Sequence, residues 1–342
     1  MKHLTFLALS KLCVLVAGVM AAGASMAQDK KIVLRLADSF PSGHFLHQHG
    51  TRPWMEQVTR ATNGAVAFEH YPAEQLGKAK DLLSLVQSGV ADGSLFVVSY
   101  ASDKLPLASV VELPGMFATA CQATLAHWKL AREGGILAQR EYGPNGVRIL
   151  FTITPAPYQL AVAERRIDSA KDLEGLKVRI VGGSMELTMR KLKAVGVRTS
   201  APDAYEAVTR GTLDGVLFAY GSVLQYNIPT KFVTSGDGFG SVAIVFMVNE
   251  NKWKQFPEAV KKAMSDAGEA VNRTACAGMD RDEAGDLQKL KQKGVVEVRW
   301  SGDTLRQVDA AKASVASEWA AELDKRGKPG TQVLKAVQAA RE

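Results

Sequence analysis

Arg179 is the side chain in this sequence whose surroundings most suggest binding chemistry. It stands near the end of an expected strand, Leu176–Ile180, and is followed by Gly182-Gly183-Ser184 and an expected helix. A guanidinium fork beside the free N–H groups of a helix N-terminus forms a ready carboxylate site. The pattern is therefore compatible with a site that binds a carboxylate. From position alone, a surface arginine at a strand end is the more ordinary interpretation.

Three histidines, His44, His47 and His49, form the second group that could do chemistry. His44 and His47 are three residues apart at an expected helix start, so they could share one face and hold a metal ion. No Asp, Glu or Cys close by in the sequence completes such a ligand set. We therefore interpret the three histidines as a solvated or hydrogen-bonded helix end, and we expect no metal site and no cofactor.

The enzyme motifs that we sought do not occur in the sequence. Gly182-Gly183-Ser184-Met185-Glu186 places a serine after two glycines but lacks the closing glycine of a nucleophile elbow. The glycines from Gly236 to Gly240 have the wrong spacing for a dinucleotide loop, and there is no phosphate-binding loop motif. Acidic pairs such as Asp172 and Glu174 are typical of a solvated helix face. We therefore expect a protein that binds without catalysing a reaction.

The elements of the first half predict a parallel α/β sheet. Short apolar runs alternate with amphipathic stretches at a spacing that is typical of strand, helix, strand, helix, strand. We expect strands at 31–37, 65–71, 93–98 and 147–153, and helices around Trp54, at 78–88 and from 120 to about 141.

A second α/β unit follows Thr154-Pro155-Ala156-Pro157, which we interpret as a hinge because prolines make poor sheet. A glycine-rich break at 236–240 precedes a strand at 242–248 that we expect to return to the first unit, and a mostly helical tail follows. Such a two-lobe protein would hold its ligand in the cleft between the lobes. The expected strands are 158–163, 176–180, 197–199, 215–219 and 295–300, and the expected helices are 184–194 and 203–210.

The first 27 residues have the features of a secretory signal. Lys2 and Lys11 are their only full charges, and an apolar run from Leu12 to Ala24 precedes Ser25-Met26-Ala27, an A-x-A-like cleavage site. The run is shorter than the ~20 residues that a membrane span needs. We therefore expect residues 1–27 to be removed, a periplasmic location, and no membrane insertion of the mature chain.

Composition places the chain among ordinary globular proteins, with 46% hydrophobic and 23% charged residues in 342, enough for two domains. Loss of the leader leaves 40 basic residues against 35 acidic ones, and no basic cluster accompanies this small excess. We therefore expect no nucleic-acid partner. The two cysteines that remain, Cys121 and Cys276, could pair or stay as buried thiols.

Seven sequence fragments follow the leader in a characteristic order over about 180 residues. Together they resemble the substrate-binding proteins of tripartite ATP-independent periplasmic (TRAP) transporters, the DctP-type family. The fragments are Leu34-Arg35-Leu36-Ala37 with Phe40-Pro41-Ser42-Gly43-His44, Thr62-Asn63-Gly64, Tyr71-Pro72-Ala73-Glu74-Gln75-Leu76-Gly77, Val86-Gln87-Ser88-Gly89-Val90-Ala91-Asp92-Gly93, Glu112-Leu113-Pro114-Gly115-Met116-Phe117, Asp172-Leu173-Glu174-Gly175-Leu176-Lys177-Val178-Arg179, and Tyr205-Glu206-Ala207-Val208 through Asp214-Gly215.

The resemblance implies a two-lobe α/β periplasmic binding fold with a hinged cleft and a long helix that bridges both lobes. We expect residues 28–153 with 241–280 to form one lobe, and 154–240 with 281–342 to form the other. The resemblance also implies capture of an organic acid and its delivery to the subunits of a TRAP membrane permease. A ligand-sensing partner of a membrane receptor is the alternative that the sequence leaves open.

The resemblance also implies which residues bind the ligand. The arginine of the family's D-L-K-G-L-K-[IVL]-R segment pairs with the ligand carboxylate, and here it is Arg179. Many relatives carry a second arginine where this chain has Gln159, and an asparagine where it has Phe218. These departures favour a monocarboxylate with an apolar or aromatic body. We expect the rest of the ligand-binding site to include Tyr158, Tyr220, Tyr100 and His44.

Overall fold

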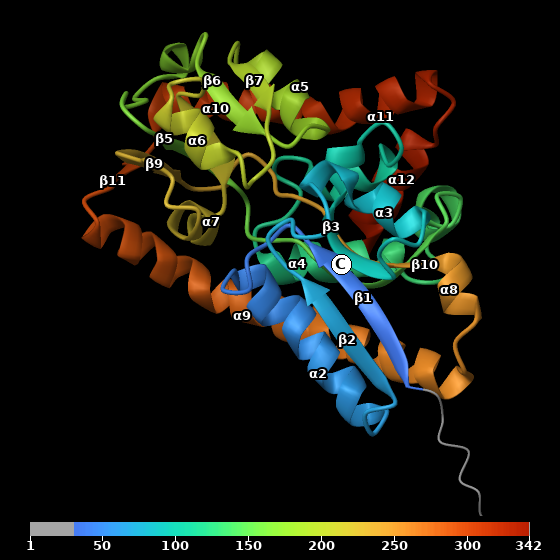
Figure 1. Cartoon of the computed structure of the whole chain (residues 1–342). Coiled ribbons are helices and arrows are strands. Elements are labelled where there is room, and N and C mark those ends of the chain that lie inside the picture. Colours follow the sequence, from blue (N-terminus) through green and yellow to red (C-terminus); the bar gives the residue numbers. More distant parts are fainter. Residues whose placement is uncertain (1–30, 342) are drawn as a thin grey trace, which may run out of the picture.

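The computed structural model describes residues 31–341, so the predicted leader lies outside the described residues. The fold is α/β with two separate sheets (Figure 1). One sheet has five strands in the order β2-β1-β3-β10-β4, and the other has six in the order β11-β9-β5-β8-β6-β7. Two sheets, each covered by helices, confirm the predicted α/β class.

The five-stranded sheet joins the first part of the chain to a strand from much later. Strand β1 is parallel to β2 and β3, whereas β10 runs antiparallel between β3 and β4. The strand predicted at 242–248 therefore does return to the first sheet. Trp54, Phe151 and Phe246 pack together in its core, with ring centroids 4.4 Å apart for Trp54–Phe246. The strands are β1 Ile32–Asp38, β2 Val66–Tyr71, β3 Gly93–Val97, β4 Val147–Ile153 and β10 Ile244–Asn249.

The six-stranded sheet contains a strand that the sequence did not predict. Strand β9, Phe232–Ser235, pairs with β5 on one side and β11 on the other. Four residues carry too short a pattern to be recognised, and their pairing depends on neighbours that are distant in the chain. The other strands are β5 Gln159–Val162, β6 Lys177–Ile180, β7 Val195–Arg198, β8 Gly215–Phe218 and β11 Val296–Arg299.

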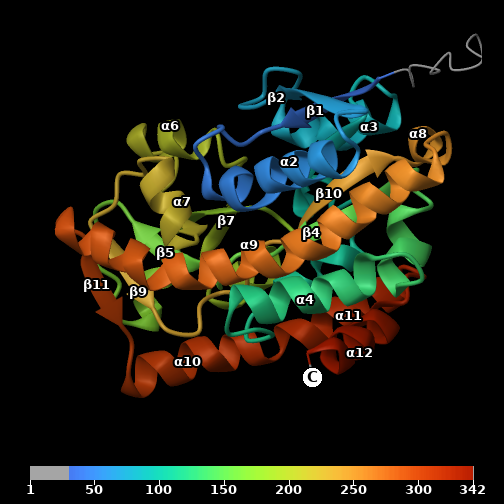
Figure 2. The ribbon, with the colours of Figure 1, turned by 90° about the horizontal axis from the view of Figure 1, so that it is seen from below.

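Helix α9, Glu258–Gln292, is the predicted bridge between the two halves (Figure 2). It packs on α2 (Arg52–Ala61), α4 (Ala120–Ala131) and β4 at the first sheet, and on α7 (Tyr220–Gln225) beside the second. A disulfide between Cys121 and Cys276 links α4 to α9. Pairing, one of the two alternatives left open for these cysteines, is therefore the one that the structure shows.

The helix expected from 120 to about 141 is shorter than predicted. It ends at Ala131, and a separate π-helical turn covers Ala138–Tyr142. Gly134 between them has a φ of +82°, a left-handed conformation that an α-helix does not continue through. The remaining helices are α3 Leu82–Gln87, α5 Ser184–Lys191, α6 Ala204–Thr209, α8 Glu250–Lys254, α10 Gly302–Ala313, α11 Val315–Lys325 and α12 Gly330–Ala340.

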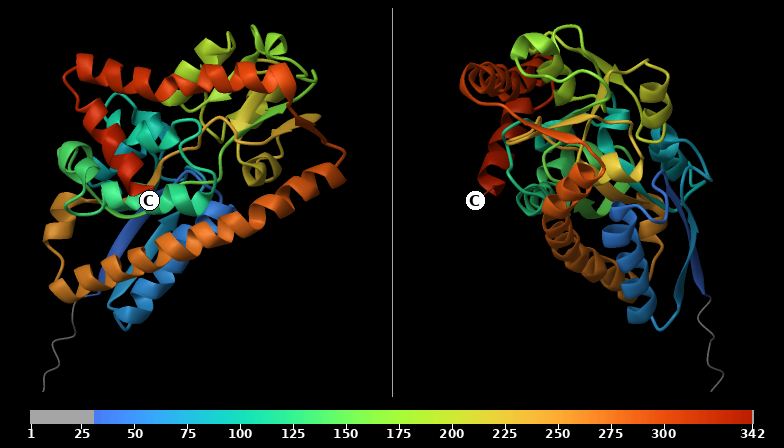
Figure 3. Two further views of the ribbon diagram at one scale, coloured as in Figure 1. Left: turned by 180° about the vertical axis from the view of Figure 1, so that it is seen from behind. Right: turned by 90° about the vertical axis from the view of Figure 1, so that its left-hand side faces the viewer.

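The C-terminal helices return across the molecule on the side opposite α9 (Figure 3). Helix α12 packs on α4 and on the 3-10 turn Leu107–Glu112, and Trp319 of α11 donates to Ser109 Oγ at 2.8 Å. These partners belong to the first predicted lobe, although residues 281–342 were assigned to the second. The lobe boundaries stay a prediction. Across residues 31–341 we find no helix with the length and apolar character needed to cross a membrane.

The predicted hinge at 154–157 and the glycine-rich break at 236–240, which we also expect to act as a hinge, lie side by side, because Tyr158 directly after the first bonds to the second. Tyr158 N–H donates to Gly240 O at 2.6 Å, and Phe239 N–H donates to Tyr158 O at 2.9 Å. Gly240 has a φ of +90°, and a Cβ added there would lie 2.0 Å from Glu112 O. Only glycine fits so close a backbone approach. Hinge motion about these segments stays a prediction.

Candidate ligand-binding site

Arg179 is buried between the second sheet and residues of the first half, with 1% of its surface exposed. Its Nε donates to Thr199 O at 3.0 Å, Nη1 to Leu217 O at 3.1 Å, and Nη2 to the Tyr100 hydroxyl at 3.3 Å. Within residues 31–341 it pairs with no carboxylate. A desolvated cation is costly unless an anion balances it, so this guanidinium is suited to bind one.

An aromatic wall surrounds the guanidinium of Arg179. Its Cζ lies 4.3 Å from the centre of the Phe218 ring, close enough for a cation–π interaction. Phe218 in turn meets the edge of Tyr158 at 6.0 Å and stacks on Tyr226 at 5.9 Å. Three rings and one cation therefore share a single site. Arg179 comes from β6, Phe218 from β8, Tyr158 from the residue before β5 and Tyr226 from the residue after α7.

Tyr226 is the member of this wall that sequence reasoning missed. Its hydroxyl is buried and has no hydrogen-bond partner among the described residues. Burial raises the pKa of this phenol well above its usual range, the nearby Tyr100 raises it further, and Arg179 opposes the shift. The phenol is therefore a neutral donor beside the arginine. The signal that could have found it is the helical stretch after Phe218, which was not predicted.

His44 approaches the same wall from the first half of the chain. Its ring lies 5.2 Å from Tyr226, and it also contacts Phe40 and Phe45. Burial, and then the charge of His47, lower the pKa of His44 to about 3, so the imidazole is neutral. Nδ1 accepts from the Leu46 N–H at 3.3 Å, which leaves the proton on Nε2. That buried N–H has no partner in the described chain.

Tyr100 connects the two halves across this site. Its hydroxyl accepts from the Ala201 N–H at 2.9 Å as well as from Arg179. Beside it lies a cavity of about 550 Å³ whose lining includes Ser99 and Tyr100 from one half, and Val181 and Thr199 from the other. A second cavity of about 550 Å³, lined by residues such as Val162 and Asp214, does not include Arg179. The lining of the cavity at Tyr100 does not include Arg179 either, but it contains Tyr100 and Thr199, two direct hydrogen-bond partners of Arg179.

The polar groups of Gln159 and Tyr220 form hydrogen bonds away from Arg179. Gln159 Nε2 donates to Gly236 O at 2.9 Å, and its Oε1 accepts from Thr234 Oγ1 at 2.9 Å. The Tyr220 hydroxyl donates to Thr234 O at 2.9 Å. Thr234 belongs to β9, the strand that was not predicted. The structure thus brings together five of the predicted residues, and the side chains of Gln159 and Tyr220 bond within the second sheet.

The helix N-terminus expected to help Arg179 faces a carboxyl group of the protein itself. A Cβ added at Gly183, just before α5, would lie 3.0 Å from Glu112 Oε2. Glu112 accepts from Ser99 Oγ at 2.5 Å and from the Ala243 N–H at 3.0 Å. Burial raises the pKa of Glu112 to about 7. Participation of the α5 N–H groups in ligand binding therefore stays a prediction.

The three histidines near the start of the chain do not gather at one point. His49 bonds to Asp282 of α9 at 2.8 Å, and His44 belongs to the aromatic wall. His47 instead stacks on His70, with ring centroids 4.6 Å apart. The three therefore do not form the shared metal face that their spacing suggested.

Two bridged α/β halves, with a buried arginine among rings where they meet, define a two-lobe solute-binding protein. The family model for bacterial extracellular solute-binding proteins, family 7 (DctP), matches residues 36–322. The chain therefore belongs to this family, the substrate-binding proteins of TRAP transporters, and the predicted family is confirmed.

Known relatives cover most of the chain. A solute-binding protein of Albidiferax ferrireducens is 23% identical over 83% of this chain and 85% of its own length. The C4-dicarboxylate-binding periplasmic protein DctP of Rhodobacter capsulatus is 26% identical over 72% of this chain and 74% of its own. A solved marine metagenome TRAP solute-binding protein from an unidentified microbe, specific for aromatic acid ligands and bound to metahydroxyphenylacetate, is 25% identical with a TM-score of 0.83, covering 91% of this chain and 98% of that one.

Proposed function

We propose that this protein captures a monocarboxylate with an aromatic or apolar body in the periplasm and delivers it to a TRAP membrane permease without chemical change. The observation that carries the proposal is the buried Arg179 guanidinium, which meets carbonyl and phenol oxygens but no carboxylate of the described chain. An arginine fork binds a carboxylate through two parallel hydrogen bonds, which fixes the acid end of the ligand.

The neighbours of Arg179 favour one carboxylate rather than two. Phe218, Tyr158 and Tyr226 contribute rings, and the unpartnered polar groups are the Tyr226 hydroxyl and the neutral His44 Nε2–H. These groups suit a hydroxyl or the same carboxylate. A second carboxylate placed against these rings would be buried beside neutral groups, which costs several kcal/mol.

The aromatic body is supported by a solved relative. The marine metagenome protein is specific for aromatic acids, and it was also solved with 3-hydroxybenzoate. A ring in the ligand would pack against Phe218 and its neighbours, where aromatic pairs add about 0.5–1.5 kcal/mol beyond the area they bury.

Delivery to a permease and the lack of catalysis are supported by the family. Its members are extracellular solute-binding proteins, and the predicted leader directs the chain to the compartment where they act. The groups around Arg179 are phenols, a neutral imidazole and a phenyl ring, which can hold an acid in place. Uptake of labelled 3-hydroxybenzoate by cells with and without this chain tests delivery, and uptake that is unchanged on deletion contradicts it.

Isothermal titration with three acids tests the ligand class. We expect 3-hydroxybenzoate to bind at least about tenfold more tightly than succinate or glucuronate, a difference of about 1.4 kcal/mol. Phe218→Asn should reduce this difference in affinity, because the asparagine amide can form hydrogen bonds to a polar ligand. Tightest binding of the diacid or the sugar acid by the wild-type chain would overturn the monocarboxylate proposal.

A further inference from the structure

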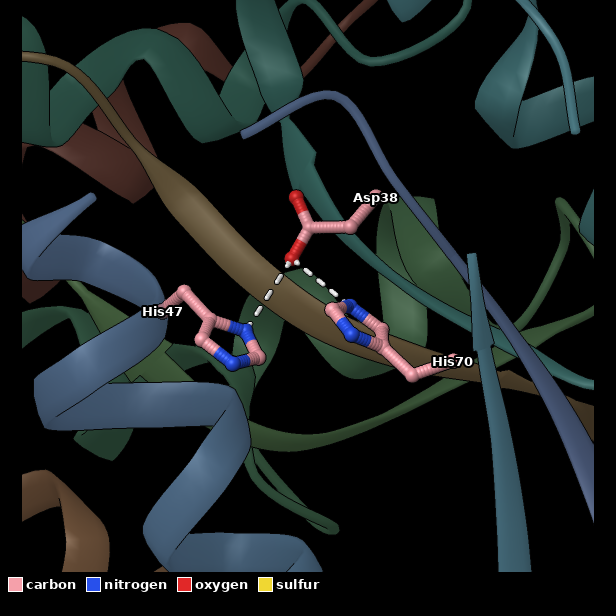
Figure 4. A group of neighbouring side chains, drawn as sticks. All are labelled: Asp38, His47 and His70. Atoms are coloured by element: carbon pink, nitrogen blue, oxygen red, sulfur yellow. Dashed lines mark ion pairs between the residues drawn. The ribbon is translucent and has the colours of Figure 1, made fainter. Parts of the chain in front are cut away.

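Three potential metal ligands meet beside the candidate site, each from a different element. Asp38 ends β1, His70 lies near the end of β2, and His47 begins the π-helical turn His47–Thr51. Their side chains point toward one another (Figure 4). Asp38 Oδ2 lies 3.6 Å from His70 Nε2 and 4.0 Å from His47 Nδ1, and the three atoms lie within 4.8 Å of one another.

These atoms are buried, yet they lack hydrogen-bond partners. Asp38 is 1% exposed and His47 is 5% exposed. Asp38 Oδ2, His47 Nδ1, His70 Nε2 and the nearby Thr51 Oγ1 all have no partner among the residues described. Buried polar atoms are nearly always satisfied, so four such atoms in one place call for a shared partner.

The separations among the three atoms match a common metal ion better than direct bonds. A hydrogen bond would bring two of them to about 2.9 Å, which both measured distances exceed. Two ligands on one tetrahedral zinc, each about 2.0 Å from the metal, lie about 3.3 Å apart. Small shifts of the two imidazoles would therefore complete this geometry.

We propose that Asp38, His47 and His70 bind a Zn²⁺ ion. Two imidazole nitrogens and one carboxylate oxygen form a ligand set that zinc uses, whereas Ca²⁺ and Mg²⁺ prefer oxygen ligands. A water molecule would complete the coordination. Asp38 Oδ1 accepts from the Phe40 N–H at 2.9 Å, which orients the carboxylate.

The bound ion would join β1, β2 and the π-helical turn that precedes α2 at the edge of the first sheet. His44, which contacts the aromatic wall, lies one helical turn before His47, so the ion would also fix the segment that carries His44. The inference stands on Asp38, His47 and His70 alone, and it holds whatever acid the Arg179 site binds.

Zinc titration of the untagged, EDTA-treated mature protein tests the proposal. Native mass spectrometry should show one Zn²⁺ per chain, and Co²⁺ in its place should give the visible absorption of a tetrahedral site. Zinc should also raise the melting temperature, because an ion that binds only the folded chain stabilises it by mass action. If the wild-type protein binds neither Zn²⁺ nor Co²⁺ at one ion per chain, the proposal is wrong.

Variants locate the ion. Asp38→Asn and His70→Gln should each weaken zinc binding on the order of 100-fold or more, since even outer-shell changes cost 10–100-fold. His49→Gln is the matched control, because His49 bonds to Asp282 instead. If Asp38→Asn does not fold, the zinc affinity of His70→Gln tests the assignment of the ligands. Wild-type zinc affinity in His70→Gln would refute the assignment, and Arg179→Ala, which tests the acid site, should keep its zinc.

Discussion

Two arginines of this chain pack against aromatic rings and differ in how their charge is balanced. Arg148 of β4 lies over Trp253 at 5.3 Å, donates to both carboxylate oxygens of Glu250 at 3.0 and 3.2 Å, and pairs with Glu133 at 3.0 Å. Arg179 lies over Phe218 at 4.3 Å and donates to two carbonyl oxygens and a phenol. Arg148 is partly exposed, whereas Arg179 is buried.

The difference supports the proposal that Arg179 binds a ligand, whereas Arg148 has a structural role. Arg148 is balanced by acids of its own chain, so its ion pairs need nothing from outside. Arg179 carries a desolvated charge that the described chain does not balance, an arrangement that costs stability until an anion arrives. A charge that lowers stability in the free protein is best explained by what it binds.

Removing the Arg179 guanidinium should give the largest effect on binding. Arg179→Ala should lose about 2–5 kcal/mol of affinity for 3-hydroxybenzoate, on the order of 30-fold to several thousand-fold. Arg179→Lys should also bind poorly, because a point charge cannot replace a bidentate fork. Isothermal titration measures both variants, and wild-type affinity in Arg179→Ala would end the assignment.

The free energy of unfolding without ligand should depend more on Arg148 than on Arg179, the reverse of their expected importance for ligand binding. Arg148→Ala leaves Glu250 without its partner and should lower the free energy of unfolding by about 1–3 kcal/mol. Arg179→Ala should lower it less, because it removes an unbalanced buried charge. Urea denaturation without ligand compares the two variants, and a larger loss in Arg179→Ala would break the comparison between them.

Glu112 is a buried acid, and it should make the free energy of unfolding depend on pH. Burial raises its pKa from 4.5 to about 7, so between these values the folded chain binds more protons than the unfolded chain. The free energy of unfolding should therefore fall as pH rises through this window, by up to about 3 kcal/mol. Glu112→Gln should remove that part of the slope in urea denaturation from pH 5 to pH 8.

Glu250→Gln is the matched control for Glu112→Gln. Glu250 pairs with Arg148, so its loss should lower stability across this pH range rather than flatten the slope. Glu141 is also buried with its pKa raised to about 7, so the test is the difference between each variant and the wild type. Equal slopes in the wild type and in Glu112→Gln would contradict the expectation.

Phe218 and Trp253, the rings that pack against the two arginines, should differ in their effect on ligand affinity. Phe218→Leu should weaken 3-hydroxybenzoate binding by up to about tenfold, because it removes the ring on which the ligand ring would pack, a contact worth about 0.5–1.5 kcal/mol. Trp253→Leu should leave the affinity unchanged, since Trp253 packs against Arg148. Titration of both variants decides, and equal losses would show that Phe218 has no special role at the ligand.

The smallest expected effect concerns the contact across the two halves. Tyr100→Phe removes the hydroxyl that accepts from Arg179 and Ala201, and it should weaken ligand binding by about 0.5–1.5 kcal/mol. Tyr71→Phe is the control, because the Tyr71 hydroxyl bonds to the nearby Glu69.

X-ray scattering should show a smaller radius of gyration when ligand is added to the wild-type protein. An unchanged radius at saturating ligand would count against closure of the two halves.

Local pattern was sufficient to predict much of this molecule. Alternation of apolar strands and helices predicted the α/β class, the return of β10 to the first sheet and a mostly helical tail, while the family resemblance implied the long bridging helix seen as α9. The family motif that ends at Arg179 gave the cation of the candidate site, although its burial was not predicted. These features follow from short segments whose periodicity, or whose order along the chain, is itself the evidence.

Several candidate residues depended on which strands become neighbours. Gln159 and Tyr220 matched the expected site by position, yet both bond to Thr234 of β9, a strand whose pairing the sequence did not reveal. Tyr226 joined the site through an unpredicted helix. Position along the chain does not determine which partner satisfies a buried polar group, because that partner comes from a distant segment.

The sequence by itself determined the family and the two α/β units and gave Arg179 as the candidate for ligand binding, since each of these is encoded in contiguous residues. Only the tertiary structure decided that Cys121 pairs with Cys276, that Arg148 is balanced and Arg179 is not, and that Asp38, His47 and His70 converge. Those outcomes depend on distances between residues far apart in the chain, which packing of the two sheets and α9 sets.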